Sequence, residues 1–202
     1  MSLRASFPGG QKKFELVRDQ QIVVASATLF RIRATRSFGN VKAGQLGGFV
    51  QAEQNLNHQG NCWIADDACV SGGARVFDNA QVANNARIMD HATISGDAWV
   101  GDRARVYGEA RLYERARIYG DSQVFEKAHV YGNALVCDDA IVLGNAIVYG
   151  DAQVTGHAQV FDDARVFDHA RVSDDAKVLG NDVIGGNATV RHTVVRAPKG
   201  PT

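Results

Sequence analysis

Alanine recurs every six residues along most of this chain, and that period limits the possible folds more than any other feature. The column runs from Ala68 to Ala176 with Ser122 as an exception, and it returns at Ala188 after Asp182. An aliphatic residue stands two places after each member. Six steps would turn an α-helical side chain about 240° from its starting face, whereas residues two apart share one face of a β-strand. Gly, Asp or Asn then favour a tight turn, so each hexad predicts a short strand and a corner.

The residue after each aliphatic position shows how many hexads form one coil. At steps of eighteen, bulky residues gather in two columns and mostly small ones in a third, whereas steps of twelve mix them. The columns are Met89, Tyr107, Phe125, Leu143, Phe161 and Leu179; Phe77, Ser95, Tyr113, Tyr131, Tyr149 and Phe167; and Ala83, Gly101, Tyr119, Cys137, Thr155 and Ser173. We therefore predict an all-β chain, a single-stranded parallel β-helix of triangular section with three hexads per coil. About seven coils would make a rod on the order of 35 Å long.

The repeat resembles the hexapeptide-repeat family, whose fold is the left-handed parallel β-helix. The family motif is an aliphatic residue, then Gly, Ala or an acid, two free positions, a small residue and one free position. Val100 to Arg105 and Ile184 to Thr189 match it fully, whereas in Val148 to Gln153 an aromatic residue takes the second slot and glycine follows one place late. The resemblance implies left-handed winding, which the spacing alone does not determine.

A narrower resemblance covers 41–64, which is similar to the leading segment of bacterial and phage hexapeptide-repeat proteins that carry a transferase label. Before it, 14–17 and 22–33 are rich in Val, Ile, Thr and Phe, and they predict a β-hairpin or meander. We expect 1–45 to cap the open strand edges, 46–194 to form the β-helix, and 195–202 to be disordered. Asp182 in an inward slot predicts a local register change near the last coil, because a lone buried carboxylate is costly.

Composition excludes several classes of partner. Lys plus Arg equals Asp plus Glu at 22 each, so no global field would attract nucleic acid or an anionic membrane. No apolar stretch is long enough to span a membrane, and the N-terminus lacks the apolar run of a signal peptide. The cysteines Cys62, Cys69 and Cys137 are odd in number and contain no CxxC pair. We therefore expect reduced thiols, no metal site and a cytoplasmic location.

An enzymatic hypothesis follows from the resemblance, because many family members transfer acyl groups from coenzyme A or acyl carrier protein with a histidine as general base. His157 and His169 are the candidates here, each at a corner position with Asp175 or Asp151 one coil away. A solvated turn residue is the simpler interpretation, and we commit to no catalytic residue. The repeat also lacks the inserted loop that often walls the active site of such acyltransferases. The other histidines are His58, His91, His129 and His192.

The bulky columns suggest a surface for protein contacts instead. Their rings can stack from coil to coil, and aromatic residues often anchor interfaces. Leu135, Ile141 and Ile147 place an apolar girdle around one coil, which is unusual on a monomer. The predicted partner-binding residues are Tyr107, Tyr113, Phe125, Tyr131, Leu135, Ile141, Ile147, Tyr149, Phe161 and Phe167.

Arginine recurs in the outward slots, and we expect nearby acids to pair with it rather than leave a basic stripe for nucleic acid. The arginines are Arg75, Arg87, Arg105, Arg111, Arg117, Arg165 and Arg171, and the acids are Asp78, Glu109, Glu114, Asp162 and Asp168.

Three functional hypotheses remain open. The first is a non-enzymatic β-solenoid scaffold that forms a homo-oligomer, such as the trimer frequent in the family, or binds a bacterial or phage partner, with no cofactor. The second is an acyltransferase that uses a coenzyme A thioester. The third is capture of a small ligand or nucleotide between protomers.

Overall fold

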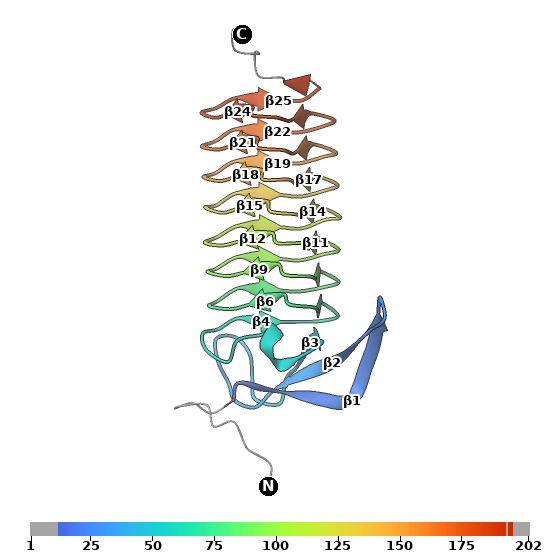
Figure 1. The fold of residues 1–202 in the computed structure, drawn as a ribbon. Coiled ribbons are helices and arrows are strands. Elements are labelled where there is room, and N and C mark those ends of the chain that lie inside the picture. The colour runs from blue at the N-terminus through green and yellow to red at the C-terminus, as the bar shows by residue number, and fades with distance from the viewer. Residues whose placement is uncertain (1–11, 193, 196–202) are drawn as a thin grey trace.

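The computed structural model describes residues 12–192, 194 and 195, and these form a rod of stacked coils with a hairpin at its N-terminal end (Figure 1). An eleven-stranded sheet begins with β1 (Phe14–Val24), β2 (Ala27–Ala34) and β3 (Leu46–Val50), and two further sheets hold eight and seven strands. The short 3-10 helix η1 spans Glu53–Asn55. The rod is therefore a single-stranded parallel β-helix with one sheet on each of its three sides.

Each strand of the rod is two residues long, as the hexads predict. The eleven-stranded sheet continues through β5 (Cys69–Val70), β8 (Arg87–Ile88), β11 (Arg105–Val106), β14 (Gln123–Val124), β17 (Ile141–Val142), β20 (Gln159–Val160), β23 (Lys177–Val178) and β26 (Val194–Val195). The eight-stranded sheet contains β4 (Trp63–Ile64), β7 (Gln81–Val82), β10 (Trp99–Val100), β13 (Arg117–Ile118), β16 (Leu135–Val136), β19 (Gln153–Val154), β22 (Arg171–Val172) and β25 (Thr189–Val190). The seven-stranded sheet contains β6 (Arg75–Val76), β9 (Thr93–Ile94), β12 (Arg111–Leu112), β15 (His129–Val130), β18 (Ile147–Val148), β21 (Arg165–Val166) and β24 (Val183–Ile184).

The register confirms three hexads per coil. Arg105 pairs with Gln123 in parallel, and Gln123 with Ile141, a step of eighteen each time. The chain winds through about eight coils rather than seven, because parallel pairing already begins at β3 and β4, before the regular alanine column. The alanines from Ala68 to Ala176 and the aliphatic residues beside them are buried, and they form one continuous core along the axis. Stacking thus makes a core that no single coil could bury.

The corners explain why acids and glycine alternate along the edges of the rod. From Ile64 to Ile184, the second residue after each aliphatic position has a positive φ, for example 57° at Glu126 and 72° at Gly144. Glu126 Oε2 accepts a hydrogen bond of 2.9 Å from the backbone N–H of Gly144, one coil further on. A Cβ on Gly108 would lie 2.8 Å from the backbone nitrogen of Glu126. The bare glycine therefore leaves room for the next coil, while the acid satisfies a turn amide.

The N-terminal hairpin joins the rod through a continuous sheet. The strand β1 pairs with β2 in the antiparallel sense, with a register shift between Val17 and Gln21, and β2 pairs with β3 in the same way. β3 then pairs in parallel with β5 of the rod. The antiparallel pairing confirms the predicted hairpin. Figure 1 shows its far end projecting sideways from the axis of the rod.

The two breaks in the alanine column are accommodated differently. Ser122 is buried, and its hydroxyl donates a 2.7 Å hydrogen bond to the carbonyl of Tyr119. Asp182 also points inward, and only 3% of it is exposed. Asp182 itself causes no register change, because Val183 still pairs with Arg165 at a step of eighteen, and the change predicted near the last coil comes later. The step falls to seventeen only at Val194, which pairs with Lys177. Of the predicted tail 195–202, all but Val195 lies outside the described residues.

Candidate functional site

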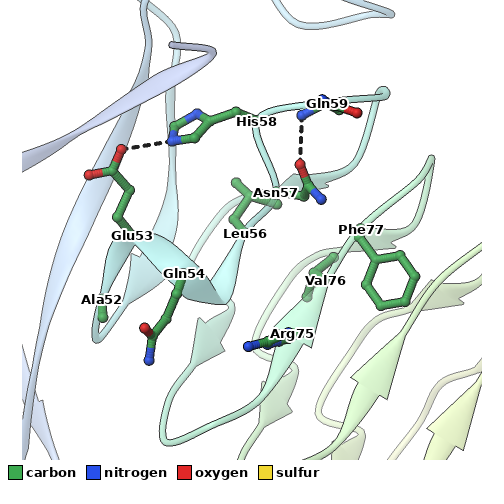
Figure 2. Close-up of a pocket in the computed structure, with 10 residues that line it drawn as sticks. All are labelled: Ala52, Glu53, Gln54, Leu56, Asn57, His58, Gln59, Arg75, Val76 and Phe77. Atoms are coloured by element: carbon green, nitrogen blue, oxygen red, sulfur yellow. Dashed lines mark hydrogen bonds and ion pairs between the residues drawn. The ribbon is translucent and has the colours of Figure 1, made fainter. Parts of the chain in front are cut away.

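A wide hollow lies where η1 meets the first coils. It has a volume of about 800 Å³. Figure 2 shows Glu53 and His58 on one side of it and Val76 and Phe77 on the other. Glu53 belongs to η1, and His58 lies in the loop that leads to β4. The irregular segment between β3 and β4 forms this hollow. In the regular repeat, by contrast, each coil pairs directly with the next at a step of eighteen.

A carboxylate and an imidazole meet at the edge of this hollow. His58 Nε2 lies 2.7 Å from Glu53 Oε1, and Lys12 Nζ lies 2.7 Å from the same oxygen. His58 Nδ1 accepts a 3.2 Å hydrogen bond from the backbone N–H of Lys13. An imidazole that accepts at Nδ1 carries its proton at Nε2, so neutral His58 donates to Glu53. Its ring also stacks on Phe14 with a centroid separation of 4.4 Å.

A lysine and a cysteine are buried behind this pair. Lys13 and Cys62 are both fully buried, and Lys13 Nζ lies 3.1 Å from Cys62 Sγ and 2.9 Å from the Cys62 carbonyl oxygen. Burial lowers the pKa of Lys13. Burial also raises the pKa of the Cys62 thiol, although the nearby ammonium opposes that shift. The contacts tie residue 13 of the cap to the loop before β4, which is a structural role.

The Glu53–His58 pair is better suited to holding the cap than to proton transfer. A general base needs a free lone pair facing the substrate, and here His58 Nδ1 already binds a backbone amide while Nε2 binds the carboxylate. The contacts of His58 with Glu53 and Lys13 were not predicted from the sequence. They depend on a loop without the repeat pattern, so no periodic signal could have revealed them.

We expect acid to weaken the attachment of the cap. Burial alone would raise the pKa of Glu53, but hydrogen bonds from Lys12 and His58 outweigh it and hold that pKa below its ordinary value of 4.5. A carboxyl with a depressed folded-state pKa adds stability above its unfolded pKa and loses it as the pH falls through the folded value. Thermal unfolding followed from pH 6 to about 3 should therefore show an acid-dependent loss that is smaller in Glu53→Gln. An unchanged pH profile in the variant would contradict this role.

The two histidines of the enzymatic hypothesis lie at different corners of the triangle. His157 follows β19 and His169 follows β21, so the structure does not bring them together. His169 Nδ1 lies 3.5 Å from Asp151 as predicted, whereas His157 Nδ1 lies 3.6 Å from Asp139 rather than from Asp175. Both imidazoles are about 70% exposed. Among the other histidines, His91 is exposed, and His129 is half-buried with its pKa lowered by burial and by Arg111.

The predicted partner-binding residues lie where the columns place them. All ten are half-buried. In the column that follows the seven-stranded sheet, Tyr113, Tyr131, Tyr149 and Phe167 stack with centroid separations of 4.7 to 5.2 Å. Tyr107 stacks on Phe125 at 4.7 Å in the column that follows the eleven-stranded sheet. The predicted ladder of rings is therefore confirmed.

The apolar girdle consists of one aliphatic side chain on each of the three sides of the rod. Leu135 is on β16, Ile141 on β17 and Ile147 on β18, and these strands belong to three different sheets. Polar residues flank each of them in the neighbouring coils, for example Arg117 and Gln153 beside Leu135. Each face thus carries one aliphatic side chain of this girdle at the same height.

The predicted pairing of the outward arginines is wrong. Within the described residues, none of the seven makes an ion pair within 4 Å. Most of the acids named with them instead accept hydrogen bonds from turn amides one coil further on, as Asp78 does from Gly96 and Glu114 from Gly132. The corner geometry holds these carboxylates away from the faces. An alternation of acid and glycine at steps of eighteen could have predicted this.

These observations define the protein as a parallel β-solenoid with an N-terminal β-hairpin cap. No protein-family model and no curated protein matches the chain. The cysteines Cys62, Cys69 and Cys137 are free and buried. Across 12–192, 194 and 195, no cluster of His, Cys, Asp and Glu has the grouping of a metal site. The same residues contain no helix with the length and apolar character needed to cross a membrane.

Proposed function

We propose that this β-solenoid is a non-enzymatic scaffold that presents a rigid surface to other chains. Its first use is assembly into a homo-oligomer, for which the family resemblance suggests a trimer, and the same surface could serve a bacterial or phage partner. The observation that carries the proposal is the fixed array of half-buried rings and aliphatic side chains on an uninterrupted rod. Such side chains lose little conformational entropy when a partner covers them, because stacking already restricts them.

Nothing in the rod supplies an equally good case for acyl transfer. His157 and His169 are solvated at separate corners, and His58, the imidazole beside the hollow at η1, has both nitrogens engaged by the chain itself. From Ala68 to Val190 the repeat carries no inserted loop to wall a substrate pocket. A general base requires a geometry in which it reaches the acceptor group. A subunit boundary would have to create that geometry.

Native mass spectrometry tests the proposal, with one arginine substitution on each side of the rod. We expect the unmodified chain to have a mass that is a multiple of one protomer. At least one of Leu135→Arg, Ile141→Arg and Ile147→Arg should weaken assembly by about tenfold or more, since an unpaired charge in an interface costs several kcal/mol. Gln153→Arg, Gln159→Arg and His129→Arg are matched controls, because each lies in the same outward column one coil away.

The same spectra separate the other hypotheses. We expect no retained mass from acetyl-coenzyme A or from a copurified small ligand. A single protomer at the highest soluble concentration would contradict homo-oligomerisation. Retention of acetyl-coenzyme A, with transfer abolished by His157→Ala or His169→Ala, would instead establish the acyltransferase.

A further inference from the structure

In the column of stacked rings that follows the seven-stranded sheet, we call each position a rung. Between Phe77 and Phe167, the rung at Ser95 has no aromatic ring. The column reads Phe77, Ser95, Tyr113, Tyr131, Tyr149 and Phe167 from one coil to the next. Where consecutive rungs are rings, their centroids lie 4.7 to 5.2 Å apart. Ser95 therefore separates Phe77 from Tyr113 by two coil spacings of about 4.8 Å each. One planar ring placed between them would continue the stack on both of its faces.

The chain leaves this rung unfilled. A hollow of about 350 Å³ lies there, bordered by Phe77, Ser95 and Tyr113 and by residues of the adjoining strands β9, β12 and β15. Two glycines at equivalent positions are covered by neighbouring rings. A Cβ on Gly101 would lie 2.1 Å from the indole of Trp99, and one on Gly185 would lie 2.4 Å from the ring of Phe167. The opening at Ser95 is thus a specific feature of this rung, and not a consequence of a small residue alone.

The groups beside the hollow favour an anion. Arg111, His129 and the hydroxyl-bearing Thr93 border it from adjacent strands (β9, β12 and β15 follow one another up the rod in Figure 1). No Asp or Glu occupies an outward slot of the strands in this sheet. The corner acids Asp78 and Glu114 accept hydrogen bonds from Gly96 and Gly132. Arg111 makes no ion pair within the described residues, so its guanidinium can bind a carboxylate.

We propose that the missing rung at Ser95 is a binding site for a small molecule that carries one planar aromatic ring and a carboxylate. The ring stacks between Phe77 and Tyr113, and the carboxylate meets Arg111, with Thr93 and His129 at the same edge. The site does not depend on the scaffold function, because every group that forms it comes from one protomer. Its size admits a single ring, for which a dissociation constant of about 1 mM is expected.

Backbone amide NMR of the full chain, titrated with phenylacetate, tests the site. We expect saturable shifts centred on Thr93, Ser95 and Arg111. Cyclohexylacetate has the charge but not the planar ring, and benzylamine has the ring but the opposite charge. Each should bind about tenfold or more weakly, because it loses either the two stacking contacts or the guanidinium pair. Equal binding of phenylacetate and cyclohexylacetate, or no saturable shift at Thr93 and Ser95, would overturn the proposal.

Variants test the same geometry. Ser95→Phe should fill the rung, abolish phenylacetate binding and raise Tm by about 2–8 °C. Ser173→Phe is the matched control, because it adds the same ring to a small rung that is flanked by Thr155 rather than by rings. It should leave phenylacetate binding unchanged and should not raise Tm. Arg111→Gln should weaken phenylacetate about tenfold. If Ser95→Phe does not fold, or lowers Tm, the rung is not ring-sized and the stacking geometry is refuted.

Discussion

Replacing Gly132 with valine is expected to lower the free energy of unfolding by about 3 kcal/mol. Gly132 has a φ of 73°, which a β-branched residue tolerates poorly. A Cβ there would also lie 2.7 Å from the backbone nitrogen of Gly150 in the next coil. Backbone cannot rotate away as a flexible side chain can, so two coils must separate locally. Urea unfolding followed by circular dichroism would measure the loss.

Gly180→Val separates the cost of backbone strain from the cost of contact with the next coil. Gly180 has a similar φ of 63°, but within the described part of the chain a Cβ there meets nothing within 4 Å. Its valine variant should lose only the part due to backbone strain, about 1–3 kcal/mol. Equal losses at the two positions would show that contact between coils does not limit the corner residue. The acid–glycine alternation along the edges would then need another cause.

Replacing Ala110 with leucine should lower the free energy of unfolding by about 1–3 kcal/mol. Ala110 is fully buried in the core of the rod, and the register of β12 places Ala92 and Ala128 at the equivalent positions one coil away. Interiors are packed to the density of organic crystals. A larger side chain must therefore push apart coils whose spacing is set by backbone hydrogen bonds. The urea midpoint of the variant gives the magnitude.

Arg117→Leu is the matched control for this substitution. Arg117 lies in the next hexad on β13, but its side chain is outward and exposed. Adding leucine there should change stability by no more than about 0.5 kcal/mol. If the Ala110→Leu variant were as stable as the unmodified chain, the axis would contain unfilled space. The core would then not be closely packed at this position.

Much of the candidate surface could be predicted, because it shares the period of the core. The step of eighteen that aligns the strands also aligns Tyr113, Tyr131 and Tyr149, and their stacking follows from it. The partner of His157 was not predictable in the same way. Asp139 and Asp175 both stand one coil away in the sequence, and only the direction in which the imidazole leans selects Asp139. The corner hydrogen bonds of Asp78 and Glu114, rather than charge spacing, decide that the outward arginines lack ion pairs.

By itself, the sequence determined the strands, the corners, the three hexads per coil and the inward alanines, because each depends on a local period repeated many times. Tertiary structure alone decided the features that combine segments without that period. Lys13 meets Cys62 because the start of the hairpin packs against the loop before β4, and His58 meets Glu53 through the fold of that irregular loop itself. Asp182 stays inward because the strand that follows it, β24, pairs with β21 of the previous coil and is thereby held in register. The hollow at Ser95 exists because no neighbouring side chain turns into it, and a linear pattern contains no such information.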